Sequence, residues 1–122
     1  MPALRAFYRA LGWHENDGSD DTFTSFTVGG IRLALYPIAL LAAEAAPGEV
    51  TIERGSWNGV TLAVNVADRG AVDDAFLAAT QAGATAIAPP TDREWGGYSG
   101  YVADPEGNRW EIVWAPGFLD AG

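Results

Sequence analysis

The stretch YVADPEGNRWEIVW, residues 101–114, decides the fold of this chain. The segment DPEGN at 104–108 favours a tight turn, because Pro105 presets φ, Gly107 tolerates a positive φ, and Asp104 and Asn108 can bond nearby backbone. Apolar and aromatic residues flank it. The stretch therefore predicts a hairpin, with one strand at 98–103 and the next at 109–114.

The second of these strands has two different faces. Trp110, Ile112 and Trp114 alternate along one side and predict a buried core face. Glu111 lies on the opposite face, between Arg109 and Val113. If that face is also enclosed, Glu111 lines a cavity, where a carboxylate must be paired, hydrogen-bonded, protonated or bound to a metal.

The composition limits the class of protein. At 122 residues, 48% of them hydrophobic and five of them tryptophan, the sequence predicts one folded domain over residues 1–122. A net charge of -9 argues against nucleic-acid partners and anionic membranes. The absence of cysteine excludes disulfides, thiolate zinc sites and cysteine nucleophiles, and it fits a cytoplasmic location. The sequence has no apolar run near the roughly 20 residues of a membrane span.

The two halves of the chain repeat at a spacing of roughly 70 residues. Each half has a helix with an inward Phe (Phe7, Phe76) and a glycine stop (Gly12, Gly83), and each ends in a hairpin. The second half reads β-α-β-β-β, and the first half lacks its leading strand. The first half is predicted to contain a helix at 4–11, strands at 22–28 and 31–36 around a Gly29-Gly30 turn, and a short helix at 37–47. A linker follows at 48–59, with a short strand at its start. The second half is predicted to contain a strand at 60–66 with residues 60, 62, 64 and 66 inward, a helix from an Asp68 cap to about 82, a strand at 84–88, a loop at 89–97 and the hairpin at 98–114.

These features resemble the vicinal oxygen chelate superfamily, which includes glyoxalase I, bleomycin-resistance proteins and extradiol dioxygenases. The resembling motifs are residues 6–13, 30–37, 60–68, 95–98 and 104–111. The resemblance implies an α+β fold in which paired βαβββ modules form a curved half-barrel. Module one would span about 1–47, the linker about 48–59, and module two about 60–116.

The family's metal ligands can be carried over position by position. Glu111 falls on the carboxylate position of the second module, but the histidine position of that module falls at Thr61 and the carboxylate position of the first falls near Ala34. The remaining histidine position would lie in the missing strand, and His14 matches none of these positions. Because a divalent site needs three or four donors, we expect no metal cofactor.

The resemblance and the strand faces together suggest a ligand site. Glu111 could be a cavity carboxylate that acts in binding or as a general base. It could instead be a structural carboxylate that pairs with Arg109 or Arg32 or accepts backbone N–H groups. Trp95 could be a lid over the pocket or an anchor for its own loop, and Asp73 and Asp74 read as a solvated helix face. The candidate ligand-binding residues are Arg32, Tyr36, Trp57, Thr61, Asn65, Trp95, Tyr98 and Glu111, with Glu111 as the candidate catalytic residue.

Three functions remain open at this stage. The first is a metal-free glyoxalase- or bleomycin-resistance-like protein that binds a small molecule. The second is a lyase, isomerase or dioxygenase that uses Glu111 as base or metal ligand. The third is a structural or regulatory dimer with a vestigial pocket. A homodimer is expected in each case, because a missing strand leaves an edge that a second chain could cover.

Overall fold

The computed structural model describes residues 2–48, 57 and 59–117. The chain forms two compact units, Met1–Glu53 and Arg54–Gly122, and each is described by itself. Both combine helices with a sheet, which confirms the predicted α+β class. Most of the predicted linker lies outside the described residues, as does the short strand expected at its start.

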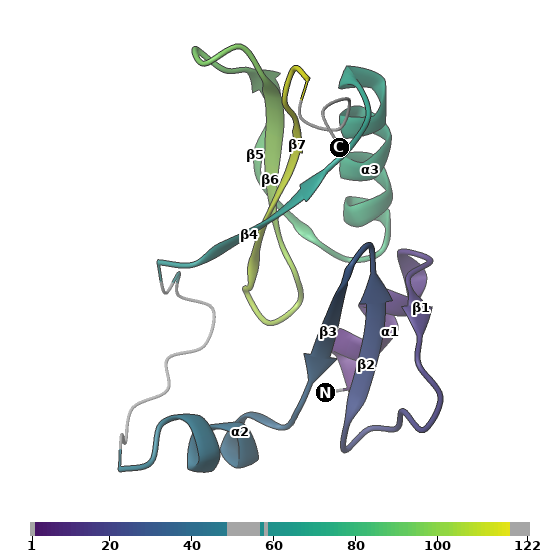
Figure 1. Ribbon diagram of the computed structural model, residues 1–122, viewed down its shortest axis with the longest axis vertical. Coiled ribbons are helices and arrows are strands. Elements are labelled where there is room, and N and C mark those ends of the chain that lie inside the picture. The colour runs from purple at the N-terminus through teal and green to yellow at the C-terminus, as the bar shows by residue number, and fades with distance from the viewer. Residues whose placement is uncertain (1, 49–56, 58, 118–122) are drawn as a thin grey trace. The chain divides into compact units, whose positions relative to one another are not determined.

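The first unit places a helix on a small antiparallel sheet of order β1-β2-β3 (Figure 1). Its core is aromatic. Tyr8 is buried, and its ring centroid lies 4.9 Å from that of Phe7, 5.1 Å from Trp13 and 6.0 Å from Phe26. The elements are α1 (Pro2–Ala10), β1 (His14–Glu15), β2 (Thr24–Val28), β3 (Ile31–Leu35) and α2 (Ile38–Ala45).

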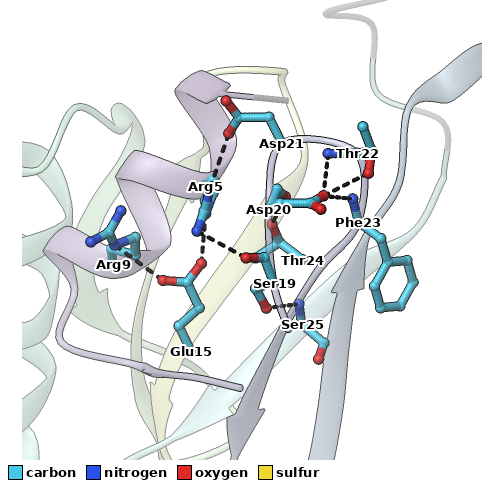
Figure 2. Close-up of polar contacts among 10 residues, drawn as sticks. All are labelled: Arg5, Arg9, Glu15, Ser19, Asp20, Asp21, Thr22, Phe23, Thr24 and Ser25. Atoms are coloured by element: carbon cyan, nitrogen blue, oxygen red, sulfur yellow. Dashed lines mark hydrogen bonds and ion pairs between the residues drawn. The ribbon is translucent and has the colours of Figure 1, made fainter. Parts of the chain in front are cut away.

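An ion-pair network joins α1 to β1, as Figure 2 shows. Arg5 Nε donates to Glu15 Oε1 at 2.5 Å, and its two terminal nitrogens reach Asp21 Oδ1 at 3.2 Å and the Ser19 carbonyl at 3.3 Å. Arg9 Nε lies 3.2 Å from the other oxygen of Glu15. The carboxylates raise the pKa of Arg5 above its usual value, so this cation is constant over the working pH range.

The loop between β1 and β2 is closed by Asp20 (Figure 2). Its Oδ1 accepts hydrogen bonds from the Thr22 amide at 2.7 Å, the Thr22 hydroxyl at 2.6 Å and the Phe23 amide at 3.0 Å. These donors hold the pKa of Asp20 below its usual value, with the Thr22 hydroxyl contributing most. The turn returns the chain into β2, which pairs with β1 in the register that sets Phe26 opposite Glu15.

The second unit is a four-stranded sheet of order β4-β7-β6-β5, with β4 parallel to β7 and the other pairs antiparallel. Helix α3 packs against β5, β6 and β7 (Figure 1). It begins at a side-chain cap, since Asp68 accepts the Ala71 amide at 2.7 Å. The elements are β4 (Thr61–Asn65), α3 (Arg69–Gln81), β5 (Thr85–Asp92), β6 (Tyr98–Ala103) and β7 (Arg109–Trp114).

The helix-covered side of this sheet, hereafter the helix face, carries the predicted core. Trp110 and Ile112 are buried, and their cross-strand neighbours on β6 are Val102 and Gly100. Gly100 allows α3 to pack closely, because a Cβ there would lie 3.0 Å from a ring carbon of Phe76. The alternation read from residues 109–114 is therefore confirmed.

Two sequence-based expectations for this sheet were wrong. Strand β5 continues through Pro89 and Pro90 to Asp92, where a loop was expected. It tolerates prolines because it is an edge strand with register shifts, so few ladder hydrogen bonds are lost. Val60 and Leu62 were expected to point inward, yet they are 59% and 43% exposed. Both lie at or beside the opposite edge strand, β4, and α3 packs over the other three strands.

Candidate functional site

The side of the second sheet opposite α3 carries the candidate site, and we call it the Glu111 face. Glu111 sits on β7 between Ala63 of β4 and Tyr101 of β6, its direct neighbours in the two ladders. Residues two positions away share this face. Its members on these strands are Thr61, Ala63 and Asn65 from β4, Arg109, Glu111 and Val113 from β7, and Ser99, Tyr101 and Ala103 from β6.

A cross-strand hydrogen bond holds the central carboxylate. The Tyr101 hydroxyl donates to Oε2 of Glu111 at 3.1 Å, and both side chains are half-buried. Burial raises the pKa of Tyr101 above its ordinary value, and the hydrogen bond to Glu111 raises it further. Tyr101 therefore stays protonated and remains a donor over the physiological pH range.

An arginine lies over the Tyr101 ring. The guanidinium carbon of Arg93 is 5.4 Å from the ring centroid, within cation–π range. Ser99 holds this arginine twice, because its hydroxyl accepts from Arg93 Nε at 2.9 Å and its carbonyl accepts from Nη2 at 2.9 Å. Ser99 is buried, so the anchor is rigid.

The turn at 104–108 sets the register that brings these groups together. Asp104 is 3% exposed, and its Oδ1 accepts the amides of Glu106 at 3.0 Å and Asn108 at 2.9 Å. The Asn108 side chain also donates to both carboxylate oxygens of Asp104. With this turn closed, Ala103 pairs with Arg109 and Tyr101 pairs with Glu111.

The two arginines considered as partners of Glu111 have contacts of their own. Arg109 Nη1 donates to the Gly107 carbonyl at 2.8 Å, within the turn. Arg32 Nε donates to the Ser25 hydroxyl at 3.1 Å in the first unit. The partner that the structure gives Glu111 is the Tyr101 hydroxyl instead.

Of the eight predicted ligand-binding residues, Thr61, Asn65 and Glu111 come together on the Glu111 face. Tyr98 lies on the helix face, three residues from Tyr101, and donates to Asp73 Oδ1 of α3 at 2.7 Å. That hydrogen bond is the main reason the pKa of Tyr98 is raised. Asp73 and Asp74 are both exposed, as expected of a solvated helix face, and Asp73 in addition accepts this hydrogen bond.

The two predicted tryptophans make local contacts. Trp57 is 60% exposed and donates from Nε1 to the Val60 carbonyl at 3.3 Å. Trp95 is 57% exposed, and its ring lies over Gly97, in the turn that the Arg93 amide closes on the Gly97 carbonyl. The contact between Trp95 and Gly97 is the kind expected if Trp95 anchors its own loop.

Arg32 and Tyr36 belong to the first unit. Arg32 lies on the sheet face that it shares with Ala34, where its neighbour Ser25 also accepts from Asn16 Nδ2 at 3.0 Å. The Tyr36 ring meets Phe23 edge-on, with centroids 6.0 Å apart. Both side chains thus have partners within their own unit.

Sequence reasoning missed Arg93, Ser99 and Tyr101 as a group. A signal for Tyr101 was present, since the hairpin register follows from the length of the turn and puts residue 101 opposite residue 111. No local pattern indicates Arg93, because its contacts depend on how the chain between β5 and β6 folds back onto Ser99.

Comparison with known proteins identifies the family. Residues 1–112 match the model of the Glyoxalase/Bleomycin resistance protein/Dioxygenase superfamily. The chain belongs to this superfamily. The membership agrees with the two units described above, which combine α-helical segments with an antiparallel sheet in the first and a mixed sheet in the second. Search of the curated proteins found no match to the chain.

Solved structures of superfamily members are similar to this chain. A glyoxalase-related enzyme from Fulvimarina pelagi is 27% identical, with a TM-score of 0.82, and the match covers 95% of this chain and 81% of that one. A family enzyme from Burkholderia phytofirmans PsJN is 26% identical, with a TM-score of 0.76 and coverage of 93% and 88%. A lactoylglutathione lyase from Agrobacterium tumefaciens is 21% identical, with a TM-score of 0.70 and coverage of 96% and 86%, and it shares the fold alone.

One finding bears on membranes. Among the helices of the described residues, none has the length and apolar character that a membrane crossing requires.

Proposed function

We propose that this superfamily member binds a small molecule on the Glu111 face of its second sheet. The observation that carries the proposal is a half-buried carboxylate at the centre of that face, flanked by the small side chain of Ala63 and the hydroxyl of Tyr101. Thr61 and Asn65 add neutral polar groups on the neighbouring strand. Polar groups placed so that they can orient a ligand are typical of a small-molecule site.

We further propose that the ligand is bound without the metal ion that the family often carries. The donors around Glu111 do not suit a divalent ion, because its ladder neighbours are an alanine and a protonated phenol, and Thr61 stands beside the cation Arg109. Within residues 2–48, 57 and 59–117, no cluster of three or more His, Cys, Asp or Glu side chains could hold an ion. Three or four such donors are usual for a stable site.

Ligand screening by thermal shift tests the binding proposal. The wild type is screened against aromatic antibiotics, thiol adducts of oxoaldehydes and small polar metabolites, in parallel with Glu111→Gln. Glu44→Gln, which changes the same charge on an exposed part of α2, is the matched control. We expect compounds that raise the melting temperature of the wild type and of Glu44→Gln but not of Glu111→Gln. If every hit stabilises all three proteins equally, the proposal is wrong.

Metal analysis tests the second proposal. The purified protein is dialysed against Zn²⁺, Ni²⁺, Mn²⁺ and Fe²⁺, and its metal content is measured. We expect substoichiometric binding that does not change in Glu111→Gln. One tightly held equivalent that disappears in the variant would overturn the metal-free proposal and favour a lyase, isomerase or dioxygenase. The homodimer remains a prediction, which light scattering of the purified chain would check.

A further inference from the structure

Two opposite charges contact Tyr101 on the Glu111 face. The Glu111 carboxylate meets the hydroxyl of this tyrosine, and the Arg93 guanidinium lies against its ring. Within the described residues, Arg93 and Glu111 form no ion pair with each other. The phenol therefore separates a cation from an anion that direct contact would otherwise neutralise.

Each charge also keeps hydrogen-bonding capacity that the described residues do not use. Arg93 donates from Nε and Nη2 to Ser99, and its Nη1 has no hydrogen-bond partner among the described residues. Glu111 accepts through Oε2, which leaves Oε1 open. Both side chains are half-buried, so solvent-sized groups reach them.

The other two described arginines of the second unit, Arg69 and Arg109, have different contacts. Arg69 pairs with Asp92 and lies 5.3 Å from the rings of both Tyr98 and Trp114. Arg109 donates into its own turn, at the Gly107 carbonyl. Of these three arginines, Arg93 is the one that lies over the Tyr101 ring, and Glu111 contacts the hydroxyl of the same tyrosine.

We infer that the Arg93, Tyr101 and Glu111 side chains form a subsite for a small zwitterion, whose anionic group binds Arg93 and whose amine or other donor binds Glu111. The apolar part of such a ligand would lie along the Tyr101 ring between the two charges. This inference rests on the proposed function, because it names the class of ligand for the same face. In it Ser99 is a positioning residue that aims Arg93, and Tyr101 positions Glu111.

Binding of simple aminocarboxylates to the wild type tests the inference without any variant. The probes are γ-aminobutyrate, δ-aminovalerate and ε-aminocaproate, which differ in the spacing of their charges. Butyrate and butylamine each carry one of the two charges alone. Amide chemical-shift changes of residues 99–101 and 109–113 report the site and the dissociation constant. We expect at least one aminocarboxylate to bind about tenfold more tightly than either single-charge probe, because it gains a second charge-assisted hydrogen bond.

Variants show which protein side chain binds each charged group of the ligand. We expect Glu111→Gln to lower the affinity for the best aminocarboxylate to that of butyrate, and Arg93→Gln to lower it to that of butylamine. Arg9→Gln, which changes an arginine that is 60% exposed in the first unit, is the control and should not alter it. Circular dichroism confirms that each variant is folded, and the comparison of probes on the wild type stands even if one is not.

The outcomes separate this inference from the proposed function. Aminocarboxylates that bind no better than butyrate and butylamine overturn the inference, as does tight binding that neither variant weakens. If library compounds without a zwitterionic group bind in a Glu111-dependent way, the inference fails while the proposed function stands. If no compound of any class depends on Glu111, both fail.

Discussion

Tyr101 and Glu111, from neighbouring strands, share one hydrogen bond whose donor is the phenol and whose acceptor is the carboxylate, at 3.1 Å. The bond lies on the side of the sheet opposite α3, while the similar pair of Tyr98 and Asp73 lies on the helix side at 2.7 Å. The two tyrosines are three residues apart on one strand and point to opposite faces. The two tyrosine–carboxylate contacts can therefore be tested separately, one on each face of the sheet.

Replacing each carboxylate should lower the pKa of its own tyrosine only. In Glu111→Gln, the pKa of Tyr101 should fall part of the way toward 10.0, because burial, its largest cause, remains. In Asp73→Asn, the pKa of Tyr98 should return closer to 10.0, because the lost hydrogen bond is its largest cause. Carbon NMR of the labelled tyrosine rings across alkaline pH gives both values in both variants. A fall in the Tyr98 value in Glu111→Gln would show that the two faces are coupled and contradict this account.

Alkaline pH should destabilise the fold in a tyrosine-dependent way. The pKa values of Tyr98 and Tyr101 are raised in the folded chain, so the unfolded chain loses these protons first as the pH rises. The stabilisation is therefore complete below about pH 10 and declines as the pH passes through the folded-state values. Urea unfolding between about pH 8 and pH 11 should show a weaker decline in the Tyr98→Phe/Tyr101→Phe double variant. An equal decline would contradict the assignment.

Arg5 should matter more to the first unit than Arg9. Both contact Glu15, but Arg5 also reaches Asp21 and the Ser19 carbonyl, and its side chain is 22% exposed against 60% for Arg9. Lysine keeps the charge but not the fork of donors that these contacts use. In a differential scanning calorimetry experiment, Arg5→Lys should therefore lower the melting temperature more than Arg9→Lys. The reverse order would mean that the network of Figure 2 does not join α1 to β1 as described.

Gly97 should not tolerate a side chain. A Cβ at this position would lie 2.0 Å from the Trp95 ring and 2.8 Å from the Trp114 carbonyl oxygen. Gly97→Ala should therefore cost about 1–3 kcal/mol in the free energy of unfolding, measured in urea. Adding Trp95→Ala should restore only part of this loss, because the backbone oxygen remains. Gly70→Ala, at the start of α3, is the control and should be neutral or stabilising, since alanine suits a helix and its Cβ meets only Asp68 at 3.4 Å.

Asp104 should be the most sensitive residue of the turn. Asp104→Ala leaves the Glu106 and Asn108 amides without their acceptor in a buried place and should cost about 1–3 kcal/mol in urea unfolding. Asp104→Asn keeps one side-chain oxygen and should cost less. Because the turn sets the register, the alanine variant should also weaken the Tyr101 contact with Glu111, which the Tyr101 carbon shift would report. An alanine variant as stable as the wild type would show that the turn does not depend on this side chain.

Local patterns predicted most elements of the fold because each depends on neighbours in sequence. The helix with inward Phe7, the Asp68 cap and the 104–108 turn all formed as expected. The predictions that were wrong concern residues whose structure depends on neighbours in space rather than in sequence. Pro89 and Pro90 lie in a strand only because that strand is at an edge, and Leu62 is exposed because α3 packs over the other strands.

The amino-acid sequence by itself determined the repeated helix-and-sheet pattern and the face on which Glu111 lies, because strand alternation and turn chemistry act over a few residues. Only the tertiary structure decided what surrounds that carboxylate. The parallel pairing of β4 with β7 puts Ala63 beside it, and the fold of the chain after β5 sets Arg93 on Ser99 and over Tyr101. These contacts join residues up to 48 positions apart, from Ala63 to Glu111, which no local period encodes.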